Sequence, residues 1–309
     1  MPGKLLGKLT DIPFGNREPV IAGDSPFIEH WAAAHGYAYS GIASAETSAM
    51  ADLFIVCTER DVYRRVNHWR EVFAGSRVLW VPFAAFDGGD EAVSYGLAQL
   101  THTDLSAVLP EQASLARILD EYRDIKVTDT SGNIAYIQIP ESASIIRDAP
   151  QGELKPGDFI SAISYFETGT EYGLESEPVN AAGSLAVQCL LYARAPSGRS
   201  TPAEIAQAKT LAQVADATEC HIDLDNGRIT SFRIKDAEAL TVLEALAGER
   251  LGLKLTEFSV GLNNHLPDPR WELNSPVNEG AAGVHIGIGD GYSGLHFDFV
   301  CPDAVISSA

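Results

Sequence analysis

The order of elements in the first third of this sequence restricts its fold most strongly. Residues 51–57 and 77–83 are short apolar runs, as expected of strands that are buried on both faces. The stretch between them has apolar residues at helical spacing and closes at Gly75. Because a strand–helix–strand unit places its two strands side by side and parallel, this order predicts an N-terminal parallel α/β layer.

The pattern changes near residue 125, where β-rich segments separated by Gly, Pro and Ser replace the alternation of strands and helices. The segments expected to form strands are 125–127, 134–139, 159–166, 184–193, 255–261, 283–289 and 295–301. Asp225-Asn226-Gly227 lies between two alternating runs and predicts a hairpin turn. We therefore expect an α/β fold with a truncated α/β N-terminal domain in residues 1–120. Residues 121–309 are expected to form a mixed β-sheet lobe with flanking helices.

Charge excludes two classes of partner. The 309 residues include 22 Lys plus Arg and 42 Asp plus Glu, which gives a net charge of −20. Such a field repels phosphate backbones and anionic lipid surfaces, so we expect no nucleic-acid or membrane partner. No apolar run of about 18 residues and no signal peptide is recognisable, which favours a cytoplasmic location. Four cysteines without a CxxC pair are expected to be buried thiols.

The three strands expected at the C-terminal end each have one apolar and one polar face. The polar faces carry Glu257 and Ser259 on the first strand, His285 on the second, and His296 and Asp298 on the third. Imidazole and carboxylate groups in reach of one another form a ligand set for Zn²⁺, Mn²⁺, Co²⁺ or, less favoured, Fe²⁺. The alternative interpretation is an ordinary wet face of a half-exposed sheet.

These residues carry a resemblance to a known family. Residues 257–263 read E-F-x-x-G-x-N, residues 283–289 read G-x-H-I-x-x-G, and residues 296–299 read H-x-D-F. In this order the motifs resemble the M29 family of metallo-aminopeptidases, the aminopeptidase T group. The resembling stretch is residues 126–300, and it implies an aminopeptidase-like fold for the C-terminal domain.

The resemblance also implies roles for particular residues. In the M29 family the matching Glu, the two His and the Asp bind a pair of metal ions, which assigns Glu257, His285, His296 and Asp298 as ligands. A Tyr seven residues after the first His assists catalysis, and Tyr292 has that spacing. A further upstream Glu ligand is matched best by Glu171, with Glu175 and Glu177 as rivals.

The sequence departs from the M29 pattern at several points. The family's Asp-Glu-Lys before the first His is replaced by residues 278–280, which read Asn-Glu-Gly. The connection from His285 to His296 and the N-terminal region are both shorter than in the family. Since these trimmed parts would enclose a substrate, the departures favour binding over turnover, and they allow that the metal has been lost.

Three functions follow from this resemblance. The first is a peptide-binding protein, similar to the M29-like proteins of crocagin biosynthesis that present a precursor peptide in this ribosomal peptide pathway. The second is an active metal-dependent aminopeptidase. The third is a mononuclear non-haem iron dioxygenase that cleaves rings, with His285, His296 and Asp298 as ligands. A homodimer is expected because M29 enzymes are typically dimers.

Overall fold

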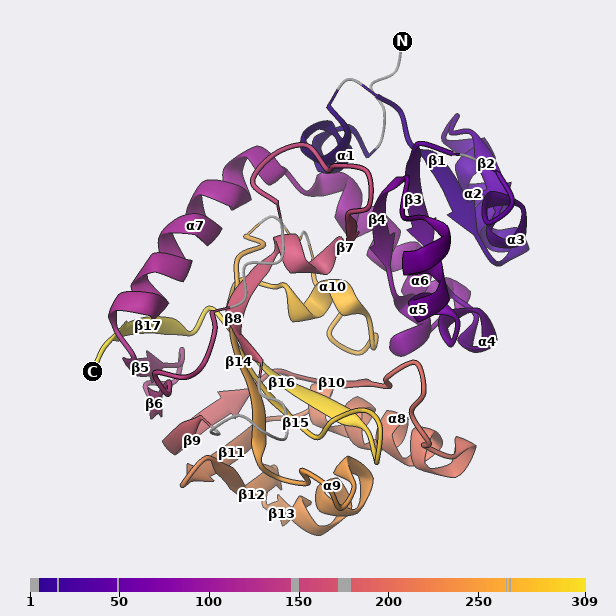
Figure 1. The fold of residues 1–309 in the computed structure, drawn as a ribbon. Coiled ribbons are helices and arrows are strands. Elements are labelled where there is room, and N and C mark those ends of the chain that lie inside the picture. Colours follow the sequence, from indigo (N-terminus) through magenta and orange to yellow (C-terminus); the bar gives the residue numbers. More distant parts are fainter. Residues whose placement is uncertain are drawn as a thin grey trace.

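The computed structural model describes residues 6–15, 17–48, 50–145, 150–171, 179–264, 266 and 268–309. It has parallel and antiparallel sheets with flanking helices, which confirms the α/β class. Figure 1 shows the N-terminal lobe on one side of the molecule and the C-terminal sheets on the other. The long helix α7 (Leu105–Glu121) leads from the first part to the second.

Five parallel strands form the N-terminal sheet. They are β1 (Val20–Gly23), β2 (Tyr39–Gly41), β3 (Asp52–Val56), β4 (Arg77–Val81) and β7 (Phe159–Ser161). Their order is β2-β1-β3-β4-β7, and every pairing is parallel, as the strand–helix–strand pattern predicted. Strand β7 comes from beyond residue 120 and still joins this sheet. The division at residue 120 stays a prediction.

Short helices surround this sheet and connect its strands. They are α1 (Gly7–Phe14), α2 (Pro26–Ala34), α3 (Ile42–Ala45), α4 (Arg60–Tyr63), α5 (Val66–Val72), α6 (Asp90–His102) and the 3₁₀ turns η1 (Phe83–Ala85) and η2 (Ile163–Tyr165). Within the described part of the chain, no helix combines the length and apolar character that a membrane span requires.

A second sheet of five strands carries the polar faces predicted from the sequence. Its strands are β8 (Glu167–Glu171), β10 (Cys189–Ala193), β14 (Leu255–Gly261), β15 (Gly283–Ile288) and β16 (His296–Pro302). They are antiparallel and lie in the order β10-β16-β15-β14-β8. The three C-terminal strands of the prediction are therefore direct neighbours, as their similar patterns suggested.

A third sheet, of seven antiparallel strands, packs against the second. It contains β5 (Asp124–Thr128), β6 (Ile134–Gln138), β9 (Asn180–Val187), β11 (Cys220–Asp225), β12 (Arg228–Ile234), β13 (Ala237–Glu238) and β17 (Val305–Ser308). Its order is β13-β12-β11-β9-β6-β5-β17. The predicted hairpin is confirmed, because Asn226 and Gly227 both have positive φ between β11 and β12.

The prediction of one strand over residues 184–193 was wrong. The chain changes sheets at Gln188, so that β9 belongs to the seven-stranded sheet and β10 to the five-stranded one. Gln188 N donates to Val300 O at this change. The sequence pattern does not show this bend. The residues on both sides of Gln188 are mostly apolar, because each strand contributes buried side chains to the core beside its own sheet.

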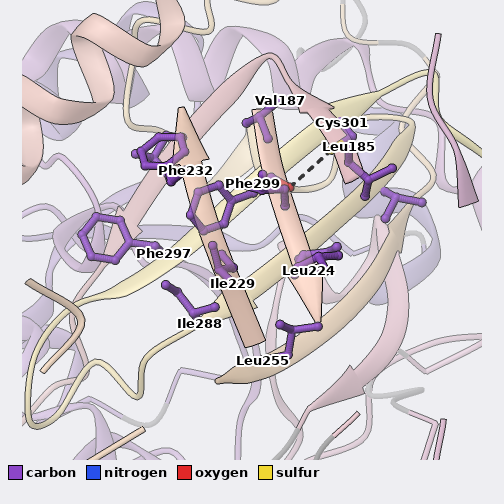
Figure 2. Close-up of a cluster of buried hydrophobic side chains, with 14 of the residues drawn as sticks. Leu185, Val187, Leu224, Ile229, Phe232, Leu255, Ile288, Phe297, Phe299 and Cys301 are labelled. Carbon is purple, nitrogen blue, oxygen red and sulfur yellow. Dashed lines mark hydrogen bonds between the residues drawn. The ribbon is translucent and has the colours of Figure 1, made fainter. Parts of the chain in front are cut away.

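The apolar faces of the two antiparallel sheets meet in one core (Figure 2). Phe232 of the seven-stranded sheet contacts Phe299 of the five-stranded sheet edge to face, with 5.4 Å between ring centroids. On the opposite face of the five-stranded sheet, Cys189, Leu191 and Val300 pack with residues of the N-terminal lobe. The face that carries the polar residues of β14 to β16 is therefore the one turned toward that lobe.

The cysteines behave as the sequence predicted. Cys57, Cys189, Cys220 and Cys301 are all buried and unpaired with one another. Burial raises the pKa of the Cys220 thiol to about 11 and that of the Cys301 thiol to about 12. The thiols therefore remain protonated, and they act as small apolar side chains.

Three further helices complete the C-terminal part: α8 (Pro202–Asp216), α9 (Leu240–Ala247) and α10 (Pro276–Glu279). Helix α8 begins with a capping box, in which the Thr201 hydroxyl accepts from Glu204 N and the Glu204 carboxylate accepts from Thr201 N. It ends at Asp216, whose carboxylate accepts a hydrogen bond of 3.0 Å from Leu190 N on β10. The helix is thereby tied to the edge of the five-stranded sheet.

We expect Asp216→Asn to stabilise the protein at pH 8. Burial raises the pKa of Asp216 to about 7, the Leu190 N–H opposes this, and the charge of Glu272 adds to it. An unfolded Asp has a pKa of about 3.9, so the stabilisation from the protonated carboxyl is full below pH ~4 and is lost as pH rises to ~7. Asn keeps the acceptor oxygen without the charge. Urea unfolding should show a gain of about 1–3 kcal/mol at pH 8 and little change near pH 4. Equal stability of both proteins at pH 8 would contradict this explanation.

Candidate functional site

The sheet register places the predicted ligands together. His285 on β15 lies opposite Ser259 of β14, and Gly287 lies between Glu257 on one side and Asp298 on the other. Directly opposed residues point to the same face, so these side chains share one surface of the sheet. The structure thus brings Glu257, His285, His296 and Asp298 into one cluster.

Glu257 lies at the centre of this cluster. Its Oε1 is 3.0 Å from His285 Nε2, and its Oε2 is 3.5 Å from His296 Nε2. Ser259 Oγ donates to Glu257 Oε1 at 2.9 Å. His296 Nε2 is also 2.8 Å from Asp298 Oδ1. Each carboxylate oxygen of Glu257 therefore faces a different imidazole.

Two glutamates that the sequence reasoning missed join this cluster. Glu167 on β8 has its Oε2 3.6 Å from His285 Nε2, and Glu279 at the end of α10 lies in the same group. Potential ligand atoms of Glu167, Glu257, Glu279 and His285 lie within 4.8 Å of one another. Those of Glu257, His296 and Asp298 form a second group of this kind. Glu257 belongs to both groups.

The cluster has a buried floor and a more open rim. His285 and Asp298 are 1% and 0% exposed, whereas the Glu257 side chain is 15% exposed and those of Glu167 and His296 are 20% exposed. An ordinary wet sheet face would expose all of these groups, so that alternative does not describe the site. A small ligand can approach from the side of the rim.

Mutual attraction shifts the ionisation of these groups. Burial opposes the charge on His285, but the hydrogen bond with Glu257 and the nearby carboxylates outweigh it and raise its pKa to about 9. The pKa of His296 is raised by Asp298 and Glu257 despite burial, and that of Glu257 is lowered by the two imidazoles despite burial. Burial and the other carboxylates raise the pKa of Glu279. Without a metal, the two imidazoles thus carry protons that face these carboxylates, and a bound cation would take the place of those protons.

The donor set fits a divalent metal ion. Asp298 Oδ2 is buried and accepts no hydrogen bond within the described part of the chain. His296 Nδ1 is 3.2 Å from Gly289 O and can donate to this carbonyl, while Nε2 donates to Asp298 Oδ1 at 2.8 Å and is the nitrogen that would give up its proton to bind a metal ion. A backbone carbonyl on the second ring nitrogen is the usual support of a metal-binding His. The nitrogen and oxygen donors here suit Zn²⁺, Mn²⁺, Co²⁺ or Fe²⁺.

Tyr292 and Glu171 were the residues predicted for catalysis. Tyr292 lies in the loop between β15 and β16, and it is 49% exposed. Glu171 ends β8, where its backbone pairs with Glu257. Its rivals Glu175 and Glu177 lie outside the described residues. Glu167, four residues earlier on β8, is the upstream carboxylate whose place in the cluster the structure describes.

We expect Gly287→Ala to weaken metal binding while leaving the fold intact. A Cβ atom at Gly287 would lie 2.7 Å from Glu257 Cβ and 2.8 Å from His296 Cε1, so both ligands would have to move. A shift of this kind should weaken metal affinity about 10–100-fold, as displaced supporting groups do. Competition with a metal-sensitive dye measures this affinity. Gly75→Ala is the control, because no atom lies within 4 Å of its added Cβ. Unchanged affinity in Gly287→Ala would contradict the placement of the ion.

The fold and site together define a mixed α/β protein with a buried His/carboxylate cluster suited to a divalent ion. The model of one protein family matches residues 16–309, nearly the whole chain, and this family is described as crocagin biosynthetic protein CgnE/B. The chain therefore belongs to the CgnE/B family and has a role in natural-product biosynthesis.

The solved structure of 2,5-dihydroxypyridine dioxygenase from Pseudomonas putida KT2440 is similar, with a TM-score of 0.52 and 11% identity over 98% of this chain and 93% of that one. At this identity the likeness concerns the fold alone. No curated protein matches the sequence.

Proposed function

We propose that this chain binds a peptide intermediate of natural-product biosynthesis at the partly exposed rim of the His/carboxylate cluster, with a divalent metal ion held at the cluster. One observation supports the proposal of a bound metal ion. Two imidazoles and the buried Asp298 carboxylate meet around Glu257, beneath a rim that is partly exposed. Such a group is costly to bury without a compensating cation.

Each residue has a separate role in this proposal. His296 and Asp298 would hold the ion together with Glu257, which also faces His285, Glu167 and Glu279 of the other group of candidate ligands. Ser259 orients Glu257 through its hydrogen bond to Oε1, and the Gly289 carbonyl orients His296. When bound, a divalent ion supplies positive charge that attracts and polarises a peptide carbonyl oxygen.

The peptide part is supported by the family and by the sequence. The CgnE/B family belongs to crocagin biosynthesis, and the sequence resembles M29-like proteins that present a precursor peptide in that pathway. The M29 motifs around Glu257, His285 and His296 are kept, while the loop between the two His is short. A protein that binds a peptide without cleaving it would keep the ligand residues, and it would not need a long loop to enclose the substrate.

Affinity selection from a random hexapeptide pool tests this function. The protein is loaded with Zn²⁺, separated from unbound peptides, and the retained sequences are read by mass spectrometry. We expect enrichment of a defined set by the native chain and by Glu244→Gln, an exposed control. Enrichment should be lost in Glu257→Gln. If the native chain enriches no peptide with any of Zn²⁺, Mn²⁺ or Co²⁺, the proposal is wrong.

An active aminopeptidase is the second candidate function. It is favoured by the position of Glu257 in both groups of ligands, since a shared carboxylate is what two adjacent ions would require. If the protein released N-terminal amino acids from the same peptide pool, its function would be peptide cleavage and not binding alone. Retention of about one equivalent of iron, with ring cleavage of a dihydroxypyridine, would support the dioxygenase alternative instead.

A further inference from the structure

Apart from the His/carboxylate cluster, a cavity lies at the loop between β15 and β16, beside the loop after β10. Its volume is about 380 Å³. The residues that line it are Ser197, Arg199, Arg250, Tyr292 and Ser293. Two guanidinium groups and three hydroxyl groups thus border one hollow, and Tyr292 adds a half-exposed aromatic ring.

The charge of this cavity is opposite to that of the protein. The chain carries a net charge of −20, so most cations have a carboxylate available to them. Arg199 nevertheless makes no ion pair with any described residue, and the carboxylate recorded near Arg250 is that of Asp290, at 3.8 Å. Arg199 thus has no carboxylate partner among the described residues, and Arg250 has one at the long distance of 3.8 Å, which leaves positive charge available to an external anion.

Two more arginines lie at the loop after β10, which borders this cavity. Arg60 donates to the carbonyl oxygens of Ala195 and Pro196, and Arg194 donates to that of Ala84. Neither is paired with a carboxylate among the described residues. Burial, and then the positive charge of Arg194, lower the pKa of Arg60 to about 10. Like charges are therefore held together here by the fold, which raises the local positive potential.

The two loops that form the cavity are fixed to each other. Ala195 N donates to Gly291 O at 3.0 Å, and Arg199 N donates to Tyr292 O at 3.1 Å. Asp290 Oδ1 accepts from Tyr292 N at 2.8 Å and from Ser293 N at 2.7 Å. A cavity whose walls are held by these backbone hydrogen bonds is largely formed before a ligand arrives.

We propose that this cavity binds a carboxylate of the peptide ligand, held by Arg199 and Arg250 with Tyr292 beside it. Guanidinium groups match a carboxylate with two parallel hydrogen bonds. The loop that bears Tyr292 starts at Gly289, whose carbonyl faces His296 of the metal cluster. One peptide can thus be held at the cluster and anchored at this loop. This inference rests on the proposed function, and it gives Tyr292 a role in binding.

Small anions test the cavity without any peptide. Succinate and inorganic phosphate are titrated separately at constant ionic strength, and calorimetry gives each dissociation constant. We expect both anions to bind the native chain and to bind Arg199→Gln/Arg250→Gln at least about 10-fold more weakly, the loss of one charge-assisted contact. Arg117→Gln/Lys254→Gln removes the same charge from exposed positions and should bind as the native chain does. Arg199→Lys/Arg250→Lys should recover part of the affinity.

Equal anion affinity in the native chain and the Arg199/Arg250 double variant would overturn the inference, as would no binding by the native chain. Circular dichroism establishes that the double variants fold.

Peptide pools then identify the source of the carboxylate. One hexapeptide pool has a free α-carboxylate, a second is amidated and lacks Asp and Glu, and a third is amidated and includes them. We expect the native chain to prefer the first or the third pool over the second, and the Arg199→Gln/Arg250→Gln variant to retain peptides without this preference. Equal retention of all pools by the native chain would overturn the inference. Retention of none would refute the proposed function, while the anion titration still tests the cavity.

Discussion

Glu257→Gln is expected to lose at least about 100-fold in affinity for divalent metal ions. The reason is the position of Glu257: its two oxygens face His285 and His296, and it belongs to both groups of candidate ligands. Gln keeps the size but replaces one oxygen by an NH₂ group that cannot bind a cation. Loss of a supporting hydrogen bond alone costs about 10–100-fold, so loss of a direct ligand should cost at least the upper value.

Dye competition or calorimetry with Zn²⁺ and Mn²⁺ measures this change. Glu244→Gln is the matched control, since Glu244 is exposed on α9, away from the site. Circular dichroism of both variants checks that the fold is kept. The same affinity in Glu257→Gln as in Glu244→Gln would mean that the cluster is not a metal centre.

Phe299→Ala is expected to lower the free energy of unfolding by about 3–5 kcal/mol. Phe299 is fully buried between the two antiparallel sheets, where its ring meets Phe232 edge to face (Figure 2). Truncation removes this contact and leaves a cavity where the sheets are joined. Urea unfolding followed by tryptophan fluorescence measures the loss.

Ile118→Ala is the control for this core prediction, because Ile118 is 42% exposed on α7. It should change the free energy of unfolding by no more than about 0.5 kcal/mol. Similar values for the two variants would show that the contact between the sheets does not hold the C-terminal part together.

Local patterns predicted many elements of this fold. The parallel N-terminal sheet followed from its strand–helix–strand order, and the hairpin at Asn226-Gly227 from turn residues that tolerate positive φ. The change of sheet at Gln188 was not predictable, because an apolar run does not show which layer each half joins. Nor was the pairing of β7 with β4, which joins residues about 80 positions apart. Such pairings depend on tertiary packing.

The spatial grouping of the candidate ligands was predictable where they lie on strands whose inward and outward faces the sequence pattern gives. Glu257, His285, His296 and Asp298 lie on three neighbouring strands with an alternating pattern, so one face could be assigned to each. Glu167 was missed because its place depends on the register of β8 against β14. Glu279 follows a short helix, α10, whose position the sequence pattern does not give.

The metal content of the native chain decides whether the His/carboxylate cluster is a metal centre. The protein is equilibrated with Zn²⁺, Mn²⁺, Co²⁺ or Fe²⁺, loosely held metal is removed, and the remainder is counted by elemental mass spectrometry. We expect about one or two retained equivalents of at least one of these ions, one for each group of candidate ligands that Glu257 joins. No retained metal under any of these conditions would contradict it.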